Sequence, residues 1–260
     1  MTKSIILVAF IALSGSTFAQ ENATKVKKFK LNSIGIDFGY TGDRYSKMNL
    51  ESMYDLTKNP SLLDRDLNGY TSSLYRSSDG GRIGINASFT PFSTANDSYN
   101  TNHEVRFGAY YSSREPLISY NRIDADGTRN SIIYCNMVQE LSLTGAYLIR
   151  KSPAKAKWFS VYAGLGASLG SSFNDKMVVM ESHYDPNDYS TITNENAFYE
   201  AKSSFYSRVY APIGLDVTIF NRVRLGLEGT IGVGMQNVYG GKTYVMPLSG
   251  SITTKLAFVF

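Results

Sequence analysis

Residues 248–260 read LSGSITTKLAFVF, and this last stretch of the chain decides the fold. Its apolar residues fall on alternate positions, and its polar residues fill most of the positions between them. Successive side chains of a β-strand point to opposite faces, so the stretch predicts a strand with one apolar and one mostly polar face. Chain ends usually fray in water. A long half-apolar strand that ends on the aromatic Phe260 therefore indicates that its surroundings hold this end in place.

Seven earlier segments repeat the same alternation, and with the last strand they make eight. They are 33–40, 82–89, 104–111, 140–149, 160–169, 205–219 and 224–233. No apolar repeat of helical period and useful length appears after the first residues. An even number of strands brings both chain ends to the same side of a barrel, where short turns alternate with long loops.

The predicted connections follow this rule with one exception. Residues 151–157 and the tight Asn221–Arg222 turn are short. The long connections are 41–81, 112–131, 170–204 and 235–247. Segment 90–103 falls on the side of the short turns but is longer than such turns usually are, so ten strands remain the alternative to eight.

Charged residues occur on only one face of the predicted strands. The polar faces carry Asp37, Arg82, Glu104, Arg106, Glu140, Arg208, Asp216, Arg224, Glu228 and Lys255. A charge that faces lipid at the midplane of a bilayer costs about 2–4 kcal/mol, so uncharged apolar faces favour an all-β antiparallel transmembrane barrel. A soluble sandwich or lipocalin-like barrel also alternates, but it points its apolar face inward.

Aromatic residues gather near the predicted strand ends. Trp158, Phe159, Phe258 and Phe260 lie toward the end that carries the chain termini, and Tyr40, Tyr111, Phe205 and Tyr244 lie toward the other. Such girdles suit the two interfaces of a membrane.

A barrel of eight strands is too narrow for an open channel, so inward side chains fill it. The ten charged residues named above then predict a buried, ion-paired network in the lumen, because an unpaired charge in a closed interior costs several kcal/mol. Glycines on the same face give room to neighbouring Arg or Tyr side chains. An ion path or gate is the alternative interpretation of these charges.

The start of the chain predicts export. Residues 1–19 combine Lys3, an apolar run and small residues before Ala19, as a secretory signal peptide does, and the run is shorter than a spanning helix requires. Residues 20–30 form a basic leader, expected in the periplasm, and 31–260 form the barrel domain. The chain from residue 31 onward is formally neutral, which argues against nucleic-acid binding. The single cysteine, Cys135, is predicted to pack as a small apolar residue.

The C-terminal strand and the alternation resemble small bacterial outer-membrane barrels of the OmpA and OmpX class, and the Tyr- and Asn-rich loops resemble Bacteroidetes-type members. The resemblance implies an outer-membrane location with both termini in the periplasm. It also implies contact with outer-membrane lipid and a terminal signal, Phe258 and Phe260, that the barrel-assembly machinery reads. Long extracellular loops would then bind a surface ligand or partner.

The functional prediction is a non-enzymatic structural or surface-interaction protein with a plugged lumen, without metal or cofactor. A narrow porin-like channel for small or hydrophobic solutes is the alternative. A lipid-modifying enzyme is a third candidate, because Ser182 and His183 share a predicted loop, whereas His103 falls at the opposite end of the barrel. Catalytic partners usually converge from distant positions, so this adjacency predicts no active site.

Overall fold

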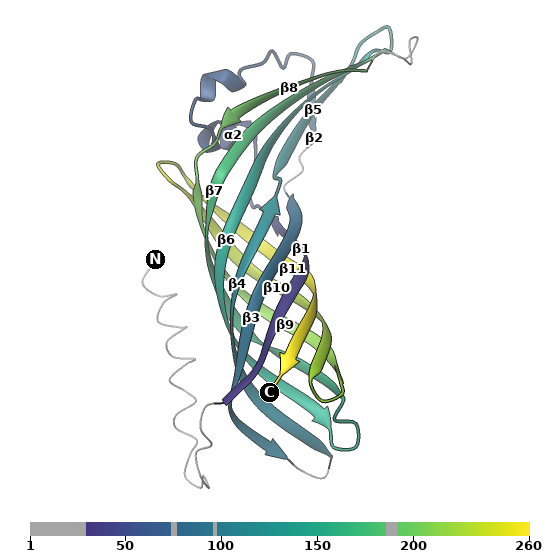
Figure 1. Ribbon diagram of the computed structural model, residues 1–260. Coiled ribbons are helices and arrows are strands. Elements are labelled where there is room, and N and C mark those ends of the chain that lie inside the picture. Colours follow the sequence, from purple (N-terminus) through teal and green to yellow (C-terminus); the bar gives the residue numbers. More distant parts are fainter. Residues whose placement is uncertain (1–29, 74–76, 96–97, 186–191) are drawn as a thin grey trace.

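The computed structural model describes residues 30–73, 77–95, 98–185 and 192–260. The predicted signal peptide and nearly all of the basic leader lie outside these ranges, and both remain predictions. Figure 1 shows a tall barrel with a long extension at one end. Its elements are β1 (Lys30–Arg44), α2 (Leu50–Leu56), η2 (Pro60–Leu63), β2 (Thr71–Ser73), β3 (Ser77–Ala95), β4 (Tyr99–Arg114), β5 (Leu117–Ile123), β6 (Arg129–Pro153), β7 (Phe159–Tyr184), β8 (Ile192–Glu200), β9 (Ser204–Ile219), β10 (Val223–Val238) and β11 (Thr243–Val259).

Eight of these strands form a closed antiparallel ring. The hydrogen-bonded order is β6-β4-β3-β1-β11-β10-β9-β7, and β6 pairs with β7 to close it. The last strand pairs with the first from Ser33 opposite Val259 to Arg44 opposite Leu248. The predicted eight-stranded barrel is therefore confirmed, and the three remaining strands, β2, β5 and β8, lie outside the ring.

The ring presents its apolar residues outward. Ile85, Leu143 and Ile252 are among the large apolar side chains left exposed, at 62%, 69% and 65%. Their neighbours in the sequence point inward and are buried, as Asn86, Ser142 and Thr253 illustrate. No helix in the described ranges is both long and apolar enough to cross a membrane.

The predicted long connections lie outside the eight-stranded ring, but they contain regular structure that the sequence did not predict. β6 and β7 contain 25 and 26 residues and continue beyond the ring, where β5 and β8 pair with them and β2 pairs with β5. The 41–81 connection contains α2 and η2, although the sequence showed no useful helical period. A capping box starts α2: the Asn49 side chain accepts from the Ser52 N–H, and the Ser52 hydroxyl accepts from the Asn49 N–H.

The 90–103 connection is also mostly strand. β3 and β4 stay paired from Phe92 opposite His103 to Ala95 opposite Asn100, so the segment is a hairpin that projects from the ring. It accounts for the length that suggested ten strands. The tight turn predicted at Asn221–Arg222 is present with its centre one residue earlier: Phe220 and Asn221 have φ values of 51° and 58°, and the Arg222 N–H donates to the Ile219 carbonyl.

A second core lies at the end of the barrel remote from Phe260. Residues 45–70, here called the cap, run through α2 and η2 and pack against the extended strands (Figure 1). Met53, Leu56 and Leu63 of the cap are fully buried with Tyr134 and Met177. Tyr244, predicted to belong to a membrane girdle, is instead buried in this core. Its hydroxyl donates to Asp55 of α2.

Candidate functional site in the barrel interior

The interior of the ring holds charged side chains in two clusters. The terminal-side cluster comprises Asp37, Glu104, Arg106, Arg150, Asp216, Arg224, Glu228 and Lys255. The cap-side cluster comprises Asp43, Arg82, Arg114, Glu140 and Arg208. All of these are buried except Arg82, Arg208 and Arg224, which are partly buried.

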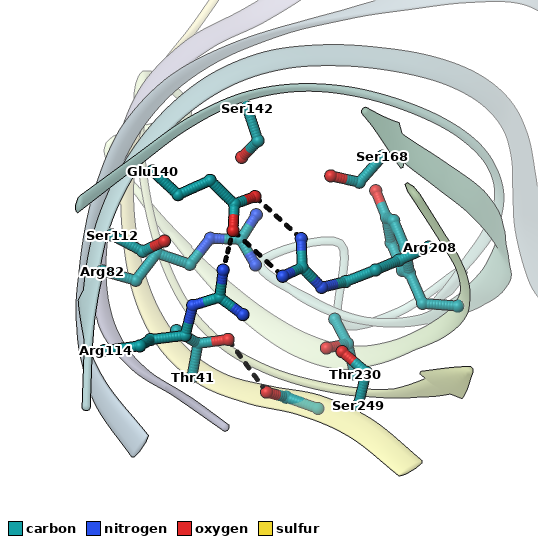
Figure 2. A pocket seen from close by; sticks show the side chains of 12 residues that line it. Thr41, Arg82, Ser112, Arg114, Glu140, Ser142, Ser168, Arg208, Thr230 and Ser249 are labelled. Carbon is teal, nitrogen blue, oxygen red and sulfur yellow. Dashed lines mark hydrogen bonds and ion pairs between the residues drawn. The ribbon is translucent and has the colours of Figure 1, made fainter. Parts of the chain in front are cut away.

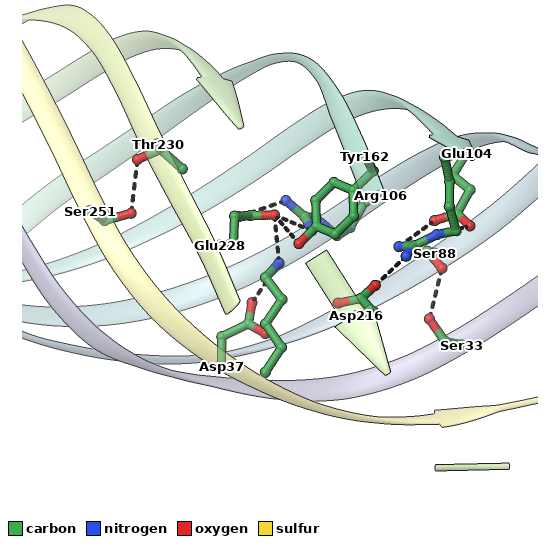
Figure 3. A network of polar contacts seen from close by, with 12 residues as sticks. Ser33, Asp37, Ser88, Glu104, Arg106, Tyr162, Asp216, Glu228, Thr230 and Ser251 are labelled. Carbon is green, nitrogen blue, oxygen red and sulfur yellow. Dashed lines mark hydrogen bonds and ion pairs between the residues drawn. The ribbon is translucent and has the colours of Figure 1, made fainter. Parts of the chain in front are cut away.

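Glu228 is one centre of the terminal-side cluster (Figure 3). Its carboxylate lies 2.8 Å from the Arg106 guanidinium and 2.9 Å from the Lys255 ammonium, and it accepts from the Tyr162 hydroxyl at 2.8 Å. Lys255 also lies 3.7 Å from Asp37, which accepts from the Tyr110 hydroxyl at 2.5 Å. Two cations and two tyrosines thus compensate two carboxylates inside a low-dielectric space.

Arg150 is the second centre of this cluster. Its guanidinium lies 2.7 Å from Glu104, ion-pairs with Asp216 and donates to the Ser160 hydroxyl at 2.9 Å. Arg224 reaches the same Asp216 at 3.9 Å. A guanidinium has several N–H donors in a planar fork, so one arginine can bind two carboxylates that come from different strands.

Arg114 and Arg208 share the same two carboxylates in the cap-side cluster, and Figure 2 shows both guanidiniums at one of them, Glu140. Arg208 lies 2.7 Å from Glu140 and 3.1 Å from Asp43, and Arg114 ion-pairs with both. The ring of Tyr206 lies 4.7 and 4.9 Å from the two guanidiniums on their cap side. An aromatic face attracts cations, so this tyrosine joins the charged interior to the apolar core above it.

Little space is left among these side chains. The cavity in the cap-side cluster has a volume of about 30 Å³, and the one in the terminal-side cluster about 20 Å³. Each holds one or two molecules the size of water. Glycines contribute to this filling as predicted, because a Cβ on Gly84 or Gly214 would overlap the rings of Tyr110 or Tyr162.

The cap lies across the mouth above the cap-side cluster. It is tied to opposite sides of the ring, because the Ser46 N–H donates to the Val245 carbonyl and the Tyr134 hydroxyl donates to the Leu63 carbonyl. Beneath it, Asp175 is 5% exposed and accepts from the Ser172 hydroxyl at 2.5 Å and the Gln139 N–H at 3.4 Å. Burial raises the pKa of Asp175 to about 6.

The structure places all ten sequence-predicted charges inside the ring, and nine of them have an ion-pair partner. Arg82 is the exception: it contacts the Tyr110 ring and the Ser251 hydroxyl. Sequence reasoning missed Asp43, Arg114 and Arg150, because it placed them in loops or past a strand end. The alternation along each strand could have identified them. Arg150, for example, is an even number of residues from Glu140 on β6, so both side chains point into the lumen.

The other candidate residues lie apart from this interior. His103 stacks on Phe92 with ring centroids 4.0 Å apart, and its Nδ1 lies 2.5 Å from the Tyr147 hydroxyl. His183 Nδ1 lies 2.7 Å from the Asn130 side-chain oxygen. Ser182 and His183 are consecutive residues of β7, so their side chains point to opposite faces. No group of three or more metal-binding side chains occurs within the described ranges.

The terminal aromatics lie at the open end of the ring near the chain terminus. Phe258 and Phe260 pack edge to face with centroids 5.2 Å apart and are 46% and 54% exposed. Cys135 is a free thiol buried in β6, which agrees with its predicted packing role, and burial raises its pKa to about 12.

The comparisons with known proteins return solved structures only, since no family model and no curated protein matches the chain. Ail, the attachment invasion locus protein of Yersinia pestis solved with the heparin analogue sucrose octasulfate, is 10% identical, with 88% of this chain and 97% of that chain covered and a TM-score of 0.31. OprG of Pseudomonas aeruginosa, an outer membrane protein, is 10% identical, with 91% and 99% covered and a TM-score of 0.37. The translocator domain of the autotransporter NalP from Neisseria meningitidis is 9% identical, with 98% and 97% covered and a TM-score of 0.19. These scores are too low to assign a function.

Proposed function

We propose that this chain is an integral outer-membrane β-barrel protein whose ring spans the bilayer, with its termini in the periplasm and its cap outside the cell. The exposed apolar side chains of the ring support this location, because lipid is the solvent that suits them. The charges lie on the opposite face of the same strands. In water this arrangement would expose a large apolar surface around the whole barrel.

The proposed role is structural or surface-interacting, without catalysis and without a continuous solute path. The observation that carries it is the layering of the interior: two ion-paired clusters, the Tyr206 ring and the apolar core of the cap follow one another along the barrel axis. Cavities of 30 and 20 Å³ leave no room for a hydrated solute.

The cap and the extended strands are the surface proposed to meet an extracellular ligand or partner. A strand needs about 9–11 residues to cross the bilayer. β6 and β7 have 25 and 26, so more than half of each is available outside it. Binding at this surface would leave the lumen closed.

Purification in detergent tests the membrane location. The protein purified in detergent is expected to show a β-rich circular dichroism spectrum and a heat-dependent shift in gel mobility. A monomer that stays dispersed without detergent would contradict the membrane location.

Conductance in planar bilayers tests the closed lumen. The wild type is expected to give no large, steady single-channel currents. A variant in which a short Gly-Ser linker replaces residues 46–70 should remain closed as well, because both charged clusters are unchanged. Steady currents in the wild type would support the channel alternative, and currents only in the linker variant would identify the cap as the sole barrier.

A further inference from the structure

The two charged clusters differ in their balance of charge. The terminal-side cluster has four carboxylates, Asp37, Glu104, Asp216 and Glu228, and four cations, Arg106, Arg150, Arg224 and Lys255. The cap-side cluster has two carboxylates, Asp43 and Glu140, for three guanidiniums, Arg82, Arg114 and Arg208. The cap-side cluster therefore has one positive charge in excess.

The excess charge resides on Arg82. Within the described ranges no carboxylate lies within 4.0 Å of its guanidinium. That group stacks 3.9 Å from the centroid of the Tyr110 ring and donates to Ser251 at 3.5 Å. Asp175 interacts electrostatically with Arg114, but its oxygens accept from Ser172 and Gln139, and it forms no ion pair within 4.0 Å with a described cation. A cation in a closed interior is costly without a counter-charge.

The cavity beside Arg82 offers a place for that counter-charge. Figure 2 shows the Arg82, Arg114 and Arg208 guanidiniums around it. Hydroxyl groups of Ser142, Ser168 and Thr230 also line the wall, as does the Glu140 carboxylate, which is already ion-paired with Arg114 and Arg208. Apart from Glu140, these guanidinium and hydroxyl groups can all donate, so the side of the cavity next to Arg82 suits a group that only accepts hydrogen bonds. A volume of about 30 Å³ holds a monatomic ion and is too small for a polyatomic oxyanion with its hydration.

We propose that this cavity binds a halide ion, chloride in the cell, as the counter-ion of Arg82. The ion is held by the Arg82 and Arg208 guanidiniums and by hydroxyls from the surrounding strands. It completes the charge balance of the cap-side cluster and thereby stabilises the ring. The site depends on the geometry of the lumen and is independent of any partner at the cap.

The first test measures stability against halide concentration. Mature protein folded in detergent is heated at constant ionic strength while chloride replaces gluconate, which is too large for the cavity. The midpoint of the gel-mobility transition is expected to rise with chloride and to saturate, because a ligand that binds only the folded state stabilises it by mass action. Arg82→Gln should abolish the rise.

Arg44→Gln is the matched control, because Arg44 is exposed at the end of β1 and faces away from the lumen. It should keep the full response to chloride. Equal responses in the Arg82→Gln and wild-type proteins, or no response in the wild type, would overturn the proposal.

A second measurement does not depend on a variant that folds. Crystals of the wild type grown with sodium bromide in place of chloride should show an anomalous peak for bromide in the cavity beside Arg82. A water molecule there without anomalous signal would overturn the proposal even if the Arg82→Gln protein could not be prepared.

Discussion

Glu228 shows how single residues maintain the interior. It is 4% exposed and compensates both Arg106 and Lys255. Glu228→Gln would leave two buried cations without this carboxylate, so we expect the free energy of unfolding to fall by about 3–5 kcal/mol. The midpoint of the heat-induced mobility shift in detergent measures the loss.

Glu200→Gln is the control for this prediction, because Glu200 is exposed and pairs with the exposed Lys58 at 2.8 Å. Exposed ion pairs contribute little. A fall of similar size in both variants would show that burial of the ion pair does not determine its contribution.

Asp175 predicts a dependence of stability on pH. Burial raises its folded pKa from 3.8 to about 6, so the folded state binds this proton more tightly than the unfolded state. The stability that the folded protein gains from this bound proton is therefore fully present below pH 3.8 and is lost as pH rises through about 6. The free energy of unfolding changes by about 3 kcal/mol at most over this range. In Asp175→Asn the amide oxygen can still accept from the Gln139 N–H and the amide NH2 can donate to the Ser172 hydroxyl, without a charge, so the variant should be more stable than the wild type at pH 8.

The measurement compares the mobility-shift midpoints of Asp175→Asn and the wild type from pH 4.5 to 8. The difference between the two proteins should grow as pH rises. Parallel curves would mean that Asp175 titrates near its ordinary pKa in the folded protein.

At the scale of elements, the cap is predicted to open independently of the ring. Leu56 of α2 is fully buried in the cap core, and Leu56→Ala removes packing worth about 2–5 kcal/mol. The cap core is separate from the two charged clusters that fill the ring, so the loss should appear as local opening. Trypsin should then cut faster after Lys58 and Arg65, while the heat-induced mobility shift of the ring stays unchanged.

Leu62→Ala is the control within the same segment, since Leu62 is 45% exposed in η2. It should leave the rate of cleavage unchanged. If Leu56→Ala also lowered the midpoint of the heat-induced mobility shift, the cap and the ring would unfold as one unit.

At the scale of the whole molecule, the last residue tests how the barrel is assembled. The Phe260 N–H donates to the Asn32 carbonyl at the junction where the ring closes. Its ring packs against Phe258 and is half exposed, so its packing is worth less than the ~1.5–3 kcal/mol of a fully buried aromatic. Deletion of Phe260 should therefore lower the amount of barrel in the membrane far more than the heat stability of the barrel that forms.

Membrane levels are measured by quantitative blotting of outer-membrane fractions, and stability by the mobility shift of purified protein. Unchanged levels with a large loss of heat stability would identify Phe260 as a packing residue, contrary to its predicted role as an assembly signal.

The sequence by itself determined the ring. The alternation of apolar and polar residues can be read within each strand alone. Because a bilayer surrounds the barrel and side chains fill its lumen, the apolar residues face outward and the polar residues face inward. The eight strands and the inward positions of the ten charges follow from it, and so does closure between the two chain ends.

Only the tertiary structure decided how the strands continue and what covers the mouth. On β6 beyond Glu140, inward residues such as Val138 and Tyr134 pack against the cap, while outward residues such as Met137 and Ile133 stay apolar. The contrast between the faces disappears there, so the strand has no signature in the sequence. The cap core joins residues 45–70 to partners as distant as Met246, and the same contacts between distant strands bring Asp43 and Arg114 together with Arg208. Packing of this kind depends on positions in space, which the order of residues along the chain does not reveal.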